Sequence, residues 1–369
     1  NTHLREVQRE TIDGDVYQYF ESLVDKIITS GDESDTKFLS FDSSEPPCPI
    51  GPGQFTRLKL TDGSCNLTSF TSSFIKLKIK TTVGFNFSVG MRPIISTIID
   101  SAMNDCPCLY VGFKSGIHAI DHYRFYCDKG RGYMCEQSQA VYESAVTYMV
   151  KSQEELEGEQ GCYATMENIR KLDPNVPGRY ITWKEFKDHY SGSSMDIEFE
   201  VVIKYDDFAP LQFFKSFPND VCGNIQLEFK IANNKNIVFC QVPFEAQVAW
   251  LKKHRNSALM ESAKADEKVY MLYGVECNDV SFANMGDDCP FHFIDDMTTA
   301  ESGVQAFAGA LYLNEARSYI NGYNIKQNKM NEIRDLLSTK KIYIPGQRID
   351  QYSFSQTPTS SNMSCNTTQ

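Results

Sequence analysis

The sequence predicts a mainly β protein, built as an antiparallel sandwich with helical insertions. Several short segments alternate between apolar and polar residues, which is the two-residue period of a half-buried strand. Aromatic residues make up 12% of the chain, with 24 Phe and 19 Tyr, and such side chains pack well on a pleated surface. The predicted helices do not interleave with the strands in βαβ order, so a parallel α/β sheet is the weaker interpretation.

The clearest predicted strand lies within residues 74–82, where aliphatic side chains alternate with Lys76, Lys78 and Lys80. The same period predicts strands over 195–204 and 224–231. Residues 237–242 form another candidate strand, and we interpret Asn233, Asn234 and Lys235 as the hairpin turn that leads into it. Further candidate strands cover 268–275, 305–313, 342–344 and 348–354.

Helical spacing of apolar residues predicts three helices, over 16–28, 137–149 and 328–337. The first lies in a region that is unusually acidic. Residues 1–47 hold eleven of the acidic residues and only four basic ones. The segment 32–53 is acidic and then rich in proline, which donates no backbone hydrogen bond, so we expect a linker or extended arm there.

These features divide the chain into three predicted parts. Residues 1–53 form an acidic N-terminal arm with an amphipathic helix and a Pro-rich linker. Residues 54–356 form the β-sandwich with its insertions. Residues 357–369 form a polar C-terminal tail, low in hydrophobic residues.

The charge of the chain narrows the choice of partners. The net charge is −12 at pH 7, whereas phosphate binding depends on clustered Lys and Arg. We therefore expect no direct sequence-specific binding of nucleic acid. No apolar run approaches the roughly 20 residues that cross a bilayer, so we expect no membrane span.

The twelve cysteines are scattered and too few for a disulfide scaffold, so we interpret them as reduced. The Asn-x-Ser/Thr sequences at Asn66, Asn86, Asn362 and Asn366 are expected by chance in a chain of this composition. The alternative is a secreted or cell-surface β-sandwich binding module, with real disulfides and glycans. A count of free thiols under denaturing conditions separates the two interpretations, with near twelve expected for the reduced protein.

A metal-dependent enzyme is the second alternative. His118 and His122 stand four residues apart, a spacing that suits a zinc site, and Cys127 or Cys135 would supply a further ligand. The segment lacks a Cys-x-x-Cys pair and the Glu that metalloproteases carry beside the first His. Structural histidines are the favoured interpretation, and stoichiometric zinc in the purified protein would reverse it.

Other chemical patterns are weaker. Cys106 and Cys108 lack the spacing of a redox pair, and the glycines in 51–53 and 130–132 lack the pattern of a phosphate loop. The acidic pairs 206–207, 287–288 and 295–296 fit solvated loops, and Trp183 and Trp250 fit core packing. We therefore predict no catalytic, cofactor-binding or metal-binding residue, no cofactor and no enzymatic activity.

Four segments resemble the first jelly roll of the double jelly-roll major capsid proteins of virus-like Polinton or Maverick transposons and related DNA viruses. Residues 67–80 look like that family's Ser-rich turn followed by a long alternating strand. Residues 109–118 resemble the segment that re-enters the sheet, and 209–217 the aromatic connection into the next hairpin. Residues 344–350 resemble the crossing from the first roll to the second.

The resemblance implies a fold, a role and partners. It implies an antiparallel jelly-roll sandwich whose copies form a trimer and then an icosahedral shell around a DNA genome. It implies contacts with other capsid proteins such as a penton, and no catalysis. The protein would reside in the virion, and in the host cytoplasm or nucleus during assembly. Residues 357–369 would then be the start of a second roll.

Overall fold

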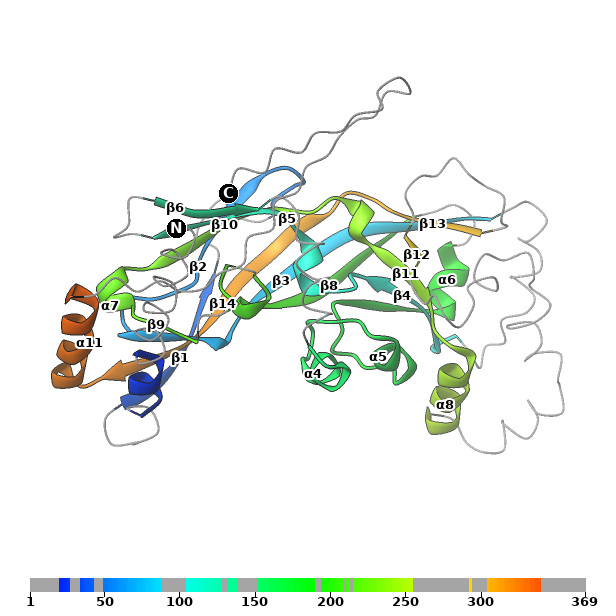
Figure 1. Ribbon diagram of the computed structural model, residues 1–369. Coiled ribbons are helices and arrows are strands. Elements are labelled where there is room, and N and C mark those ends of the chain that lie inside the picture. The colour runs from blue at the N-terminus through cyan, green and yellow to red at the C-terminus, as the bar shows by residue number, and fades with distance from the viewer. Residues whose placement is uncertain are drawn as a thin grey trace, which may run out of the picture.

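The computed structural model describes residues 20–26, 34–42, 49–87, 104–127, 132–137, 151–189, 194–208, 210–212, 215–254, 292–293 and 304–339. Antiparallel sheets form the body, and short helices lie at its two ends and along one side (Figure 1).

The first sheet is built around one long strand, β3 (Leu67–Phe87). β14 (Tyr312–Ile325) pairs with one edge of β3 and β8 (Met195–Lys204) with the other. β1 (Ser34–Asp42) adds to the far edge of β14. Two shorter strands complete the pairing of β3, namely β13 (Val304–Ala308) and β9 (Ser216–Phe217).

The second sheet has the order β2 (Phe55–Lys59), β10 (Ile225–Ile231), β5 (Ile120–Cys127) and β6 (Gly132–Gln137). Its two central strands continue into a further four-stranded sheet. There β11 (Val238–Gln241), which follows β10, pairs with β4 (Pro107–Gly112), which precedes β5. β7 (Gly178–Thr182) and β12 (His292–Phe293) form the edges of this further sheet.

Chain order and pairing together define the topology. Among the described strands, the eight of the two main sheets pair from the outside inwards: β1 with β14, β2 with β10, β3 with β8, and β5 with β6. One sheet therefore holds the first, eighth, third and sixth strands, and the other holds the second, seventh, fourth and fifth. This is an antiparallel ribbon rolled into a sandwich, which is the jelly-roll arrangement. The predicted fold class is confirmed.

One apolar core joins the two sheets. β8 and β10 alternate between buried and more exposed positions, as their sequence period predicted. Ile79 and Val201 of the first sheet belong to the same buried cluster as Phe125 and Leu227 of the second. Because burial of apolar surface dominates stability, this shared core holds the sheets face to face. Their opposite faces are left to carry polar side chains.

Several predicted elements agree with the structure. The strands predicted at 74–82, 195–204 and 224–231 lie in β3, β8 and β10. The helix predicted at 328–337 is α11 (Gln327–Thr339). The strand predicted at 305–313 divides into β13 and the start of β14, with Gly309 between them. The predicted helix 137–149 beyond residue 137, and the predicted strands 268–275, 342–344 and 348–354, lie outside the described residues.

The predicted hairpin between β10 and β11 was wrong. Residues Asn234–Asn236 form a 3-10 turn, η4, but β10 and β11 do not pair with each other. Both strands instead pair with the consecutive strands β4 and β5: β10 pairs with β5, and β11 pairs with β4. The amide of Asn236 donates to the carbonyl of His118 at 2.9 Å and connects the two segments where the ladder is interrupted. The turn therefore offsets one long strand rather than reversing it.

The linker expected at 32–53 contains a strand of the roll. β1 pairs with β14 from Ser34 opposite Ile325 to Asp42 opposite Arg317. The acidic composition of 32–53 concealed this strand. β1 lies at the edge of the sheet, where a strand pairs on one side only and charged residues are tolerated. Residues 20–26, inside the predicted helix 16–28, are helical, and Phe20 and Val24 pack with Met330 and Ile333 of α11. Parts of the predicted arm are thus packed on the sandwich.

The helical insertions are short. α4 (Gln153–Gly158) begins with a capping box in which Ser152 and Glu155 exchange hydrogen bonds. The other insertions are η2 (Gly116–Ala119), α5 (Met166–Arg170), α6 (Trp183–His189), η3 (Tyr205–Asp207), α7 (Asn219–Cys222) and α8 (Phe244–His254). In the part of the chain that the structure describes, no helix has the length and apolar character to cross a bilayer.

Candidate interaction surface

The outer face of the first sheet carries a ladder of ion pairs between β3 and β8. The lysines predicted to alternate along β3 do face away from the core, and each meets an acidic residue of β8. The separations between nitrogen and oxygen are 2.7 Å for Lys76 and Glu200, 2.8 Å for Lys78 and Glu198, and 2.8 Å for Lys80 and Asp196.

The hydrogen bond and the charge of Glu198 raise the pKa of Lys78, and the same contact lowers the pKa of Glu198. Both groups, which are charged at neutral pH in any case, keep their charges over a wider range of pH. Solvent screens exposed pairs of this kind, so the ladder sets the charge pattern of the face more than its stability.

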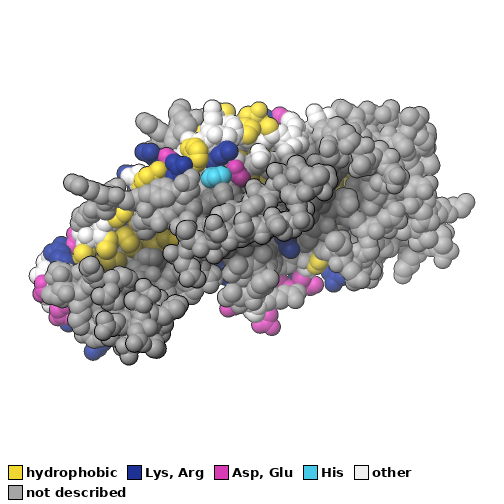
Figure 2. All heavy atoms as spheres, turned by 45° about the horizontal axis from the view of Figure 1, so that its top comes forward, with side chains coloured by type: hydrophobic (Ala, Val, Ile, Leu, Met, Phe, Trp, Pro, Cys, Tyr) yellow, Lys and Arg dark blue, Asp and Glu magenta, His cyan; other side chains and the backbone are white. Residues whose placement is uncertain are grey.

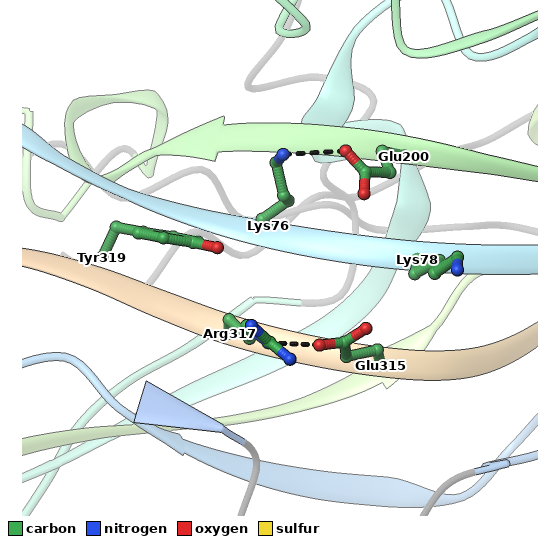
Figure 3. A pocket seen from close by; sticks show the side chains of 6 residues that line it. All are labelled: Lys76, Lys78, Glu200, Glu315, Arg317 and Tyr319. Carbon is green, nitrogen blue, oxygen red and sulfur yellow. Dashed lines mark ion pairs between the residues drawn. The ribbon is translucent and has the colours of Figure 1, made fainter. Parts of the chain in front are cut away.

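A shallow hollow of about 130 Å³ opens on this face where β3, β8 and β14 lie side by side (Figure 3). Arg317 and Glu315 of β14 form an ion pair on one side of it, and the pair of Lys76 and Glu200 lies on the other. Tyr319 lies at one end, where its ring stacks on Phe74 with centroids 4.8 Å apart. The hollow is lined by paired charges, so it suits a charged protein surface better than an apolar ligand.

The outer face of the second sheet gathers charges around Glu228 of β10. Its carboxylate accepts hydrogen bonds from Arg57 at 2.9 Å and from Tyr126 at 3.0 Å, and Arg124 lies 3.7 Å away. Arg124 also lies over the ring of Phe55, 5.3 Å from its centroid. Such contacts between guanidinium groups and aromatic rings are frequent at protein interfaces.

Two large apolar side chains are conspicuously exposed among the described residues, Phe55 at 39% and Tyr312 at 44%. Figure 2 is turned so that the top of Figure 1 comes forward. On the surface that faces the viewer, it shows basic, acidic and histidine side chains beside hydrophobic ones. The geometry provides charged faces with single exposed aromatic side chains, and aromatic residues and Arg are enriched at protein interfaces.

Among the candidate metal ligands with described side chains, His118, His122 and Cys127 do not form one site. His118 is buried in η2, whereas His122 lies in β5 beside Asp121, 3.4 Å away. The thiol of Cys127 donates to the carbonyl of Cys222 at 2.8 Å, and Cys135 lies in β6, opposite Phe125. Within the described ranges, no group of three or more His, Cys, Asp or Glu residues is placed to hold a metal ion.

Cys106 and Cys108, the cysteines considered as a redox pair, are both buried. Burial raises the pKa of Cys106 to about 12, and burial also raises the pKa of Cys108 well above its usual range. A thiol needs a lowered pKa to react near neutral pH, so burial suppresses such chemistry here. Seven cysteines have described side chains, all of them free: Cys65, Cys106, Cys108, Cys127, Cys162, Cys222 and Cys240.

Both tryptophans take part in packing. The indole of Trp183 donates to Gln247 at 2.9 Å, and Trp250 stacks on His254 within α8, with centroids 4.5 Å apart. Gly51 and Gly53 lie in a turn that requires a positive φ of 82° at Gly53, so turn geometry accounts for them. Gly132 starts β6, and Gly130 lies outside the described residues.

The Asn-x-Ser/Thr sequences have separate settings. The side-chain oxygen of Asn66 accepts a hydrogen bond from the backbone of Ile325 at 3.1 Å, and Asn86 lies in β3, opposite Gln305. Asn362 and Asn366 lie outside the described residues.

One of the acidic pairs is not a solvated loop. Asp206 and Asp207 lie in η3, at the end of β8, and Asp207 is buried beside Lys151. Sequence reasoning found the carboxylates but not the lysine, because 56 positions separate Lys151 from Asp207. The acidic pairs 287–288 and 295–296 lie outside the described residues.

Comparison with known proteins by sequence gave no relationship: no protein-family model matches the chain, and no curated protein matches it. Comparison of structures gave matches to viral capsid proteins. The chain is similar to the mavirus major capsid protein, with 11% identity, a TM-score of 0.37, and coverage of 79% of this chain and 47% of that one.

Two further matches are of the same kind. A structure of the Sputnik virophage gives 10% identity and a TM-score of 0.35, covering 80% of this chain and 48% of that one. The PBCV-1 virus capsid gives 7% identity and a TM-score of 0.30, covering 82% and 45%. The chain thus spans about half the length of the structures that it matches. The mavirus structure is described as a major capsid protein, the kind of protein that four segments of the sequence resemble.

Proposed function

We propose that the protein is a structural capsid subunit, which self-assembles into an icosahedral shell around a DNA genome. The pairing of the eight main strands as a jelly roll is the observation that carries this proposal. A shell subunit needs a rigid body that keeps its shape under lateral contact. A sandwich with one shared core provides such a body. Capsid is also the role named in the descriptions of the similar structures.

The outer faces support lateral contacts between copies. The ion-pair ladder of β3 and β8 and the group around Glu228 each present both signs of charge. Complementary charges favour specific association and suppress wrong partners. We propose a trimer as the first assembly, which then joins a shell with other capsid proteins such as a penton, in a virion or a virus-like transposon particle.

The division of the chain belongs to the same proposal. The sandwich would include β1 from the N-terminal region 1–53 together with residues 54–356, and a tail over 357–369 would lead toward a second roll. Assembly in the host cytoplasm or nucleus and the absence of catalysis also belong to it. A net charge of −12 supports a shell whose genome contacts are made by other proteins.

The mass of the protein in solution tests the proposal. Light scattering behind a sizing column, at several protein and salt concentrations, should detect trimers or larger closed assemblies. Two charge reversals, Lys78→Glu on the first sheet and Arg57→Glu on the second, locate the contact face, because the variant with weaker association marks it. A strict monomer under every condition would contradict the proposal.

A further inference from the structure

The insertion that carries α4 meets the end of β8 at a buried ion pair between Lys151 and Asp207. The ammonium nitrogen of Lys151 lies 3.3 Å from Oδ1 of Asp207. The two side chains expose 15% and 2% of their surface. Two opposite charges are thus held where water has little access, with the nitrogen at hydrogen-bond distance from an oxygen bonded to Cγ of Asp207.

A second carboxylate holds the same lysine. Oε2 and Oε1 of Glu159 lie 2.9 Å and 3.1 Å from the Lys151 nitrogen. Lys204 binds Glu159 from the other side, at 2.7 Å. In this arrangement Glu159 can take a proton from Lys151 while Asp207 faces the same nitrogen.

Both oxygens of Asp207 are held by hydrogen bonds. The hydroxyl of Tyr163 donates to Oδ1, and the backbone amide of Lys204 donates to Oδ2 at 3.0 Å. Burial, followed by the charge of Asp207, raises the pKa of Tyr163, so its hydroxyl remains a donor. Tyr163 also packs with Leu156 and Cys162 in a small apolar cluster.

From this geometry we propose that Lys151 and Asp207 join in an intramolecular isopeptide bond. The neutral amine of Lys151 attacks the carboxyl carbon Cγ of the protonated Asp207, and the Nζ–Cγ bond forms. Glu159 takes a proton from the nitrogen and passes it to Oδ1, the bond between Cγ and Oδ1 breaks, and one water molecule leaves. The backbone amide of Lys204 stabilises the charge that develops on Oδ2. No oxidant, cofactor or external reactant is consumed.

The environment favours one of the two protonation states that this reaction needs, the protonated carboxyl group, and opposes the other, the neutral amine. Burial raises the pKa of Asp207, and it raises that of Asp206 to about 6, so the carboxyl groups gain protons more readily. Burial also lowers the pKa of Lys151, but the neighbouring carboxylates outweigh it and raise the pKa overall. The resting pair is therefore ionic. Transfer of one proton to a carboxylate produces the neutral amine and acid, a pair that low polarity favours.

The bond would close a covalent loop from residue 151 to residue 207. The loop contains α4, α5, β7, α6 and β8, so the insertion could no longer separate from the first sheet. A covalent link of this kind constrains the unfolded chain, as a disulfide does, but it does not depend on the redox state of its surroundings.

Mass spectrometry of the full chain under denaturing conditions tests the proposal. The intact mass should be lower than the sequence mass by one water molecule. Trypsin should leave a branched product that joins residues 132–170, uncut at Lys151, to residues 205–215. Dehydration at Asp62 and Gly63 also removes one water molecule, so the branched product is the deciding observation. Recovery of linear peptides that end at Lys151 and of free 205–215 in full yield would overturn the proposal.

Three variants distinguish formation of the isopeptide bond from the ion pairs that surround it. Lys151→Arg keeps the positive charge and should restore the full sequence mass, and circular dichroism checks that it folds. Glu159→Gln keeps the shape but removes the proton acceptor, so bond formation should be lost or strongly slowed. Glu157→Gln alters a neighbouring glutamate that lies 3.6 Å from Lys171 instead, and it should leave the bond intact. Equal yields of the bond in the Glu159 and Glu157 variants would overturn the role assigned to Glu159.

Discussion

Gly112 of β4 and Gly178 of β7 are register partners that approach more closely than any side chain would allow. A Cβ atom on Gly112 would lie 2.4 Å from the Cα of Gly178, and one on Gly178 would lie 2.6 Å from the hydroxyl of Tyr110. That hydroxyl donates to the carbonyl of Phe113 at 2.8 Å. Glycine is thus required at both positions, because the two backbones and a buried tyrosine fill the space that a side chain would need.

Gly178→Ala should therefore destabilise the protein, by about 1–3 kcal/mol, as overpacked substitutions do. Gly158→Ala is the matched control, because a Cβ on Gly158 would meet no atom within 4 Å. Chemical denaturation of both variants checks the expectation. Equal stability of the two variants would show that β4 and β7 do not lie as closely as described.

The shared core gives a second prediction. Leu227 of β10 is fully buried between the sheets, so Leu227→Ala should lower the free energy of unfolding by about 3 kcal/mol through lost contacts and a cavity. Lys59→Ala, an exposed position on the neighbouring strand β2, should change it by less than about 0.5 kcal/mol. Urea unfolding curves measure both changes, and a small effect at Leu227 would argue against a shared core.

Asn219 gives a third prediction, because its side chain ties Thr68 of β3 to two loop carbonyls. Its amide nitrogen lies 2.7 Å from the hydroxyl of Thr68, 3.1 Å from the carbonyl of Asp62 and 3.3 Å from the carbonyl of Cys65, and it shares its two hydrogens among these acceptors. Asn219→Ala should cost about 1–3 kcal/mol, since these buried acceptors lose their donor. Asn331→Ala, on the exposed side of α11, should be nearly neutral in the same thermal unfolding experiment.

The fourth prediction concerns pH. Burial, and then the charge of Lys114, lowers the pKa of His118 from 6.5 to about 4 in the folded protein. The unfolded state thus binds more protons between these values, so stability is fully present above pH 6.5 and falls as the pH drops toward 4. The loss is on the order of 3 kcal/mol.

A matched pair of variants isolates the contribution of His118 to the pH dependence of stability. His118→Asn should show a flatter dependence of the free energy of unfolding on pH across this window than the wild type. His122→Asn, at a half-exposed position in β5, should follow the wild type. If both variants follow the wild type, the acid sensitivity does not come from His118.

How much of this fold the sequence predicts depends on what each strand faces. β8 and β10 are predicted to within a residue, because one face meets the core and the other meets solvent. Only the part of β3 from Phe74 to Thr82 follows the same rule. Near its start, Thr68 and Ser69 are polar yet buried, with Thr68 hydrogen-bonded to Asn219, so apolar periodicity does not reveal this part of the strand. β1 is hidden by its acidic composition.

The ion-pair ladder of the candidate surface could be predicted from the sequence, whereas the buried pair of Lys151 and Asp207 could not. The ladder on β3 follows from the alternating lysines, and the sequence contains its acidic partners in the alternating pattern of β8. The pairing of Lys151 with Asp207 depends on the path of the chain between them, and no local pattern encodes it. Sequence periodicity predicts faces, whereas contacts between distant segments require the topology.

Electron microscopy of the purified protein after nuclease treatment is the strongest test of the capsid assignment. We expect regular closed particles of uniform size, and nuclease-protected DNA inside those recovered from cells that also carry the genome. Only dispersed single molecules or irregular aggregates, across protein concentrations and salt conditions at which the sandwich stays folded, would contradict the assignment of a capsid subunit.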